Sequence, residues 1–192
     1  MPYRYRLYPD HPRLSFDTQP KKPLLKLKRT VVVPIGPSIA YVPLTRGQFA
    51  LIDAADADVI GQFNWHAAWN RGTQSFYAVR DVTGGGKCFL HTVVLKPKAG
   101  LLTDHANGVT LDNRRTNLRP ATVSQNAFNS RRRANATGLK GVHRNHNASK
   151  YASRIRKNGE TFYLGSFPTA QAAYEAYCAA AANIHGEYRR LA

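Results

Sequence analysis

The sequence predicts an α+β protein, and three observations carry that prediction. Short apolar stretches separated by turn residues follow Ile39 and predict a β-rich N-terminal region. Residues 103–129 combine an Asp-His pair with many Asn and Arg but no sustained hydrophobic periodicity, which predicts two short strands and a helix built around polar groups. Residues 138–192 predict a three-stranded antiparallel sheet packed on one helix.

Residues 1–38 are expected to form a basic, loosely ordered arm. This stretch holds 8 basic and 2 acidic residues within its first 30 positions, and prolines recur at positions 2, 9, 12, 20, 23, 34 and 37. Frequent proline with scattered charge argues against a packed core.

The β-rich region follows. Strands are expected at 39–44, 49–52 and 65–69, with a short helix at 54–63. Residues 76–80 and 87–95 are expected to pair across the turn Asp81-Val82-Thr83-Gly84-Gly85-Gly86 as a hairpin. The glycines are read as a turn and not as a phosphate cradle, because no Gly-Lys-Ser/Thr follows them.

The polar stretch brings three residues to one point. Apolar residues lead into Asp104-His105, and residues 117–122 are expected to form a return strand. Thr122 and Gln125 then fit a capping box, which starts a helix with Asn126 in its first turn.

The C-terminal part follows a basic linker at 131–137. Strands are expected at 141–144, 151–157 and 161–167, and a helix runs from Pro168-Thr169 to about residue 184. Gly186 is expected as its left-handed cap, and the alanine-rich face of the helix as core.

The charge predicts a polyanionic partner. With 28 Lys plus Arg against 11 Asp plus Glu the net charge is +17, so nucleic acid is the first candidate. Two distant cysteines give neither a disulfide framework nor a structural zinc site, and without an apolar run of membrane length we expect no membrane association and a cytoplasmic protein.

Asp, His and Asn together suit one chemistry. Magnesium takes oxygen ligands and few protein groups, and Asp104 with the Asn126 amide oxygen would supply two. A neighbouring neutral imidazole would take a proton from the water that attacks phosphorus. The set therefore indicates phosphodiester hydrolysis.

The spacing of this stretch, DHANG…LDNRRTNLRPAT…QNAFN, resembles the HNH endonucleases of the phage and homing type. The resemblance implies a ββα-metal motif at about 87–130 within a nuclease domain at 39–130. It implies His105 as general base, Asp104 and Asn126 as metal ligands, and Asn117 as the residue that fixes the loop and the His geometry. His91 matches an upstream family histidine, although Thr92 stands where the family usually has Arg.

Several roles stay open at this stage. His91 is a phosphate contact, a partner of the site residues or a polar residue on the first strand. Asn113 is read as a loop former, and Asn129 as either DNA-facing or solvated. Arg114, Arg115 and Arg119 are expected to meet DNA phosphates, with a solvated face as the alternative. The linker arginines Arg131, Arg132 and Arg133 are expected to follow the phosphate backbone.

Residues 138–192 are similar to the APETALA2 (ethylene-response-factor) DNA-binding domain. The matching elements are Gly141-Val142, the strand YASRIR, the strand YLGSF and the terminal HGE, with tyrosines where that family often has Trp. The resemblance implies that the exposed sheet face reads DNA through Lys140, His143, Arg144, Lys150, Arg154, Arg156, Thr161 and Tyr163.

These readings predict a metal-dependent endonuclease acting on double-stranded DNA, which nicks one strand and is targeted by its C-terminal domain. They imply no small-molecule substrate, leave the oligomeric state open with a monomer compatible, and imply a phage or prophage origin. The alternative is a catalytically silent DNA-binding regulator that keeps the nuclease fold as scaffold. An RNA-binding module would require aromatic stacking platforms that the sequence lacks.

Overall fold

A computed structural model of the chain describes residues 28–34, 38–130, 135–145 and 149–190. Its mixture of small antiparallel sheets and a few helices confirms the α+β class. The elements are, in chain order, β1 (Ile39–Pro43), β2 (Phe49–Asp53), η1 (Ala54–Asp56), α1 (Ala57–Ile60), β3 (His66–Asn70), β4 (Ser75–Asp81), β5 (Lys87–Phe89), α2 (Leu90–Leu95), β6 (Leu102–His105), β7 (Leu118–Ala121), α3 (Val123–Phe128), β8 (Val142–Asn145), β9 (Lys150–Lys157), β10 (Glu160–Phe167), α4 (Ala170–His185) and η2 (Gly186–Tyr188).

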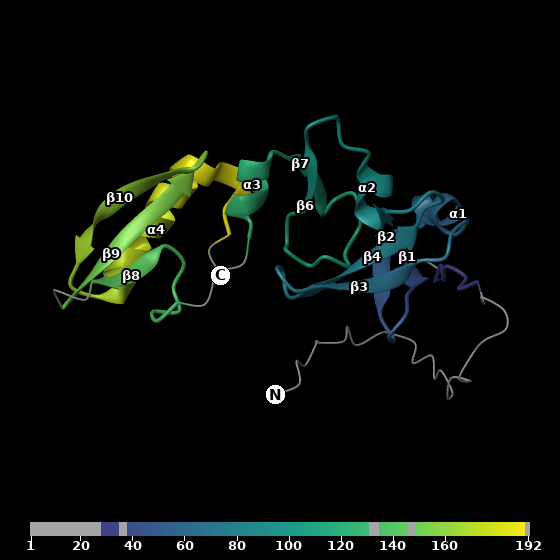
Figure 1. Ribbon diagram of the computed structural model, residues 1–192, viewed down its shortest axis with the longest axis horizontal. Coiled ribbons are helices and arrows are strands. Elements are labelled where there is room, and N and C mark those ends of the chain that lie inside the picture. Colours follow the sequence, from purple (N-terminus) through teal and green to yellow (C-terminus); the bar gives the residue numbers. More distant parts are fainter. Residues whose placement is uncertain (1–27, 35–37, 131–134, 146–148, 191–192) are drawn as a thin grey trace.

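Within the described residues, the strands form four antiparallel sheets in the orders β1-β2, β3-β4-β5, β6-β7 and β10-β9-β8. The last sheet and α4 lie at one end of the molecule and the N-terminal sheets at the other, with β6, β7 and α3 between them (Figure 1). The end of α4 and η2 reach α3, so the C-terminal part contacts the central part of the molecule directly.

The N-terminal sheets and α2 share one hydrophobic core. Ile52, Ile60, Trp65 and Leu90 are among its fully buried members. The Trp65 indole donates a hydrogen bond of 2.9 Å to the Ile60 carbonyl, which satisfies its one polar group inside the core. This core is the scaffold to which the polar loop at 110–113 is attached.

Part of the expected N-terminal arm belongs to this scaffold. Val32 exchanges backbone hydrogen bonds with Tyr41, and Arg29 bonds to the Asn64 side chain and to the Trp65 carbonyl. The expectation of a loose arm is therefore wrong for residues 28–34, because the valines at 31 and 32 add apolar surface and a short bridge to β1. The remaining residues of the arm, 1–27 and 35–37, lie outside the described residues.

The expected strand at 87–95 is a strand only to Phe89. Leu90 starts α2, which buries Leu90 and Val94 on one face, one turn apart. The segment LHTVVL is rich in β-branched residues and predicts a strand by propensity, but packing of this face against β4, β6 and β7 overrides the local preference. His91 consequently lies on a helix and not on a strand.

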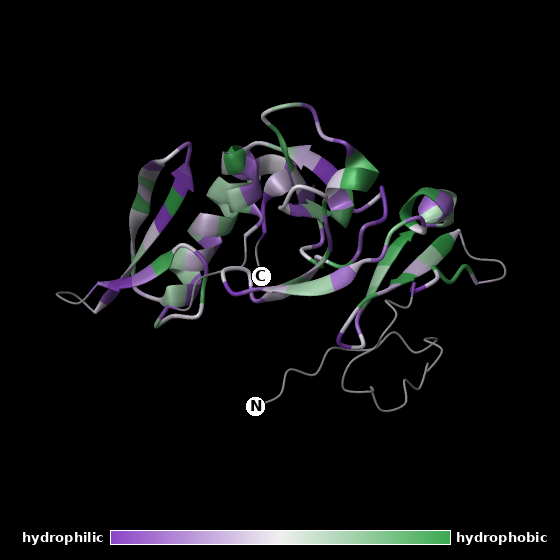
Figure 2. Ribbon diagram, turned by 45° about the vertical axis from the view of Figure 1, so that its right-hand side comes forward, coloured by the Kyte–Doolittle hydropathy of each residue, from purple (hydrophilic) through white to green (hydrophobic). Residues whose placement is uncertain are grey.

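The C-terminal sheet and helix match the expected elements closely. Ile155 packs against Tyr177 and Ala181 of α4, and residues of opposite hydropathy alternate along the strands (Figure 2). Gly141 adopts φ +76°, and a Cβ there would collide with the Tyr177 ring, so the helix comes close to the sheet at this point. Gly186 ends α4 with φ +53° but ψ −130°, so the left-handed cap expected there is wrong. Within the described residues, no helix is long and apolar enough to cross a membrane.

Candidate active site

Two buried polar residues end strand β6. Asp104 is 4% exposed and His105 is 5% exposed, and they face Arg119 and Leu118 of β7 across the hairpin. Burying a carboxylate and an imidazole costs free energy unless each is hydrogen-bonded. The partners of these two side chains therefore define the site.

The Asp104 carboxylate is held from two sides. Arg119 Nε donates to Asp104 Oδ2 at 2.8 Å. Asn129 Nδ2 lies 2.9 and 3.1 Å from the two carboxylate oxygens and donates also to the His105 carbonyl at 2.7 Å. These contacts fix both the position of the carboxylate and the end of β6.

Asn129 corrects an expectation. Neither a DNA-facing nor a solvated position is right, because the side chain is only 6% exposed and lies on Asp104. It caps the C-terminus of α3, three residues after Asn126, so both amides occupy one side of the helix. The three-residue spacing was the available signal, but the packing of α3 on β6 decides which way that side faces.

The His105 imidazole is oriented by Asn113. His105 Nε2 lies 3.1 Å from Asn113 Oδ1, and Asn113 Nδ2 donates to the Leu111 carbonyl at 3.2 Å. Since the amide NH₂ is committed to a carbonyl, the oxygen faces the ring, and an oxygen can only accept. Nε2 therefore carries the proton and Nδ1 carries the lone pair. Among the described residues no hydrogen-bond partner occupies Nδ1.

Burial lowers the pKa of His105 below its usual range. The hydrogen bond to Asn113 and the charges of Asp104 and Asp112 act in the opposite direction but do not cancel the desolvation. The ring is therefore neutral at pH 7, which is the form that accepts a proton.

The N-terminal sheet positions Asn113. Leu51 of β2 accepts a backbone hydrogen bond of 2.8 Å from Asn113 and donates one of 2.8 Å to the Leu111 carbonyl. Thr110 adds a hydroxyl bond of 2.6 Å to the Phe76 carbonyl of β4. The loop that orients the imidazole is thus attached to two sheets that precede the Asp-His pair in sequence. This long-range attachment explains why Asn113 could be read from sequence only as a loop former.

Asn117 holds the same loop from inside. Its Oδ1 accepts from the Asn107 backbone at 2.9 Å and its Nδ2 donates to the Asp112 carbonyl at 2.7 Å. The side-chain hydrogen bond to the imidazole comes from Asn113, so any influence of Asn117 on His105 passes through the loop.

His91 lies beside His105. The ring centroids are 5.1 Å apart in an edge-on arrangement, and Tyr77 and Phe89 complete a small aromatic group. Burial and the neighbouring His105 lower the pKa of His91 to about 3, so the ring is neutral at pH 7.

Asp104 and Asn126 carry oxygen atoms, the ligand type that hard cations prefer. Asp104 offers a carboxylate with more lone pairs than its present partners use, and Asn126 offers an amide oxygen on the same side of α3. Across the described parts of the chain, no three His, Cys, Asp or Glu side chains gather as a metal cluster. Magnesium commonly takes only one or two protein groups, so Asp104 and Asn126 are the residues that would hold it.

Three of the flanking arginines have carboxylate partners within the protein. Arg114 pairs with Asp112 at 2.7 Å, and Arg115 pairs with Asp56 at 2.6 Å. Arg119 is tied to Asp104, with 17% of its side chain exposed. Arg131, Arg132 and Arg133 lie outside the described residues.

The exposed face of the C-terminal sheet gathers most of the residues expected to bind DNA. In the register of β9 and β10, Arg156 lies opposite Thr161 and Arg154 lies opposite Tyr163. Residues that lie opposite each other on neighbouring strands share a face of the sheet. Since Ile155 points to α4, these four residues face away from the helix. The alternation along β8 and β9 places His143 and Lys150 on the same face.

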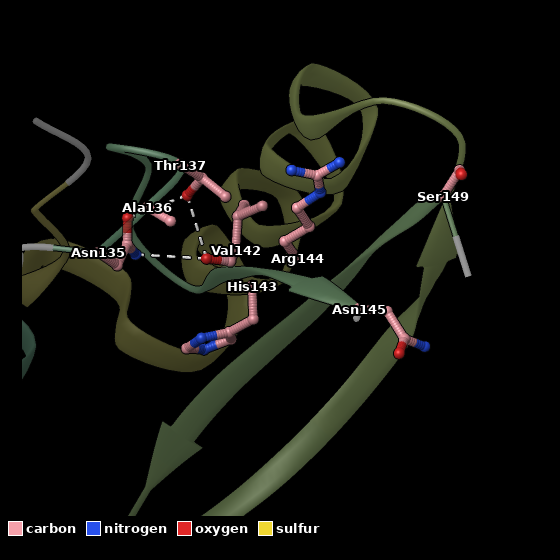
Figure 3. Close-up of a pocket in the computed structure, with 8 residues that line it drawn as sticks. All are labelled: Asn135, Ala136, Thr137, Val142, His143, Arg144, Asn145 and Ser149. Carbon is pink, nitrogen blue, oxygen red and sulfur yellow. Dashed lines mark hydrogen bonds between the residues drawn. The ribbon is translucent and has the colours of Figure 1, made fainter. Parts of the chain in front are cut away.

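Two expected residues lie elsewhere. Arg144 is on the opposite side of β8 from His143, beside a hollow of about 400 Å³ at the sheet edge (Figure 3). Lys140 donates to the carbonyls of Phe128 and Ser130, and burial lowers its pKa to about 8. Lys140 is thus a contact between the C-terminal part and α3 and not a member of the exposed face.

Comparison with known proteins gives one informative similarity. The chain is 27% identical over 158 residues to a protein named as an uncharacterized HNH endonuclease of Acanthamoeba polyphaga mimivirus, which covers 79% of this chain and 80% of that protein. No family model and no solved structure matches. The similarity supports the class of HNH nucleases for this chain.

Proposed function

We propose that the protein is a metal-dependent endonuclease that nicks double-stranded DNA and is directed to it by its C-terminal domain. The observation that carries the proposal is the hydrogen bond between His105 Nε2 and Asn113 Oδ1 beside the buried Asp104. It leaves a neutral imidazole with its lone pair on Nδ1 in the residue that follows Asp104, whose carboxylate is suited to a cation.

In this mechanism His105 Nδ1 takes the proton of the attacking water. Asn113 holds the tautomer and stabilises the imidazolium that forms, because its oxygen continues to accept from Nε2. Asp104 and Asn126 would hold the metal, with Asn129 and Arg119 fixing the carboxylate. Magnesium, when bound, would stabilise negative charge on the phosphate and on the departing oxygen.

DNA is held by the exposed face of the C-terminal sheet. Arg154 and Arg156 supply charge, and Tyr163, with 61% of its surface exposed, offers an aromatic edge beside them. One site of this kind hydrolyses one strand per encounter, so nicking is the expected product. A tethered binding face raises the local concentration of DNA at the site.

Conversion of supercoiled plasmid to the nicked form tests the proposal. Nicking should require magnesium, stop in EDTA and be lost in His105→Ala. Salt-sensitive DNA binding without cleavage by the wild type would favour the regulator instead.

A further inference from the structure

The C-terminal segment, residues 185–190, packs against the candidate active site. The His185 ring stacks on Phe128 of α3 with centroids 3.8 Å apart. The Tyr188 hydroxyl donates to the Pro120 carbonyl of β7 at 2.7 Å. These two contacts reach α3 and β7, which carry Asn126 and Arg119.

One side chain joins the segment to Asp104. The Arg119 guanidinium donates from Nε to Asp104 Oδ2 at 2.8 Å and from Nη1 to the Glu187 carbonyl at 2.8 Å. Its Cζ also lies 4.2 Å from the centroid of the Tyr188 ring. A guanidinium is planar with donors in fixed directions, so fixing Nη1 and the face of the group fixes Nε.

The segment also touches the loop after His105. Gly108, at φ +69°, donates a backbone hydrogen bond of 2.8 Å to the His105 carbonyl. A Cβ at this glycine would collide with the Arg190 guanidinium, so Arg190 packs directly on the loop backbone. Residues that follow α4 therefore contact both Arg119, the partner of Asp104, and the loop after His105.

We propose that the C-terminal segment is a working part of the nuclease site, with Tyr188 and Arg119 as positioning residues for the Asp104 carboxylate. The DNA-binding domain thereby sets the geometry of the site and is more than a tether. The catalytic part of this inference rests on the proposed function.

The test compares variants of the full-length protein. Tyr188→Leu removes the ring beside Arg119 and the bond to Pro120, and Tyr188→Phe removes only that bond. Arg189→Met is the matched control, because Arg189 is exposed and its Nη1 donates a 3.5 Å bond to the Gly186 carbonyl of its own segment. The readouts are the first-order nicking rate at saturating plasmid with magnesium, plasmid affinity in EDTA, and amide hydrogen exchange of residues 102–108 without DNA.

Tyr188→Leu should lower the nicking rate about tenfold, the lower end of the range for residues that orient metal ligands, with plasmid affinity unchanged. Exchange at 102–108 should quicken in this variant alone. Tyr188→Phe should retain most of the rate, and Arg189→Met all of it. If Tyr188→Leu does not fold, Arg190→Met takes its place with the same expectation.

A Tyr188→Leu protein that nicks at the wild-type rate, or that loses only affinity in step with Arg189→Met, would overturn the inference. If the wild type itself does not nick DNA, the proposed function fails and hydrogen exchange decides the coupling. Faster exchange at 102–108 would then support it, and unchanged exchange would overturn it.

Discussion

In the proposed mechanism, Asn113 gives the buried His105 the defined tautomer that a base requires. An imidazole with both nitrogens free has no fixed proton position, whereas an amide oxygen at 3.1 Å from Nε2 places the lone pair on Nδ1. In that mechanism the same oxygen would stabilise the charged ring after proton transfer. This single contact therefore does both tasks that the proposed mechanism requires of a partner.

Replacing Asn113 by Ala should lower the first-order nicking rate about 10- to 100-fold, as is usual when the partner that orients a catalytic or metal-binding group is removed. DNA affinity should be unchanged, because Asn113 is 1% exposed and cannot touch DNA. Single-turnover nicking at saturating plasmid measures the rate. Asn183→Ala, on the exposed side of α4, is the control. A wild-type rate in Asn113→Ala would show that the tautomer is held by something else.

His185 should make the fold sensitive to acid. Burial lowers its pKa below the usual 6.5, with nearby Lys140 and Lys157 adding to the effect against the hydrogen bond to the Arg156 carbonyl. Nδ1 is buried and has no hydrogen-bond partner among the residues that the structure describes, so protonation there would place an unsatisfied N–H beside Phe128.

The folded state thus prefers the neutral ring. The stabilisation that the neutral His185 ring gives the folded state is complete above pH 6.5 and is lost as the pH falls through the lowered pKa of His185. Urea unfolding between pH 7.5 and about 5 should show this loss, and His185→Gln should reduce it. Equal pH dependence in the two proteins would contradict the assignment.

Helix α3 is short, so its first turn matters. Thr122 accepts from the Gln125 backbone at 3.2 Å, and Gln125 reaches back to the Thr122 backbone at 2.8 Å, which confirms the expected capping box. The helix carries Asn126 and ends at Asn129, so its start fixes two amides of the site.

Thr122→Ala should destabilise the protein by about 1 kcal/mol, the usual cost of losing a side-chain cap. Urea unfolding measures this loss, and Val123→Ala is a suitable control because Val123 is 71% exposed and makes no cap. Nicking should fall modestly in Thr122→Ala if α3 frays at its N-terminus. Unfolding curves that coincide with the wild type would show that packing alone holds the helix.

The elements that could be predicted from sequence are those with local causes. The capping box, the hairpin turn at 81–86 and the strands of the C-terminal sheet follow from turn residues and alternation over a few positions. Helix α2 could not be predicted, because its sequence favours a strand and only packing on distant strands makes it a helix.

The site residues also divide into those that could be predicted from the sequence and those that could not. The Asp104-His105 pair and the spacing to Asn117 and Asn126 are legible in the sequence. The contacts of Asn113, Asn129 and Tyr188 are not, since each depends on segments that meet only in the folded chain. The contact of Arg119 with the Asp104 carboxylate likewise could not be predicted from the charge of the sequence.

At the scale of the molecule, positive charge is divided between uses. Arg114, Arg115, Arg119 and Lys140 are committed to contacts within the protein. Arg154 and Arg156 stand on the sheet face that points away from α4, and both are exposed.

Arg154→Ala should weaken binding to plasmid DNA and reduce the slope of log affinity against log salt by about 0.9, the value for one phosphate contact on a duplex. Arg144→Ala removes the same charge from the other side of the sheet and should have a smaller effect. Filter binding over a salt series without metal measures both. Equal losses in the two variants would mean that binding follows net charge and not this face.

The central claim is that His105 takes the proton of the attacking water, and chemical rescue tests it most directly. His105→Gly should bind plasmid as the wild type does but nick it far more slowly, and added imidazole should restore the rate in proportion to its neutral form. Nicking by His105→Gly at the wild-type rate without imidazole would contradict the claim.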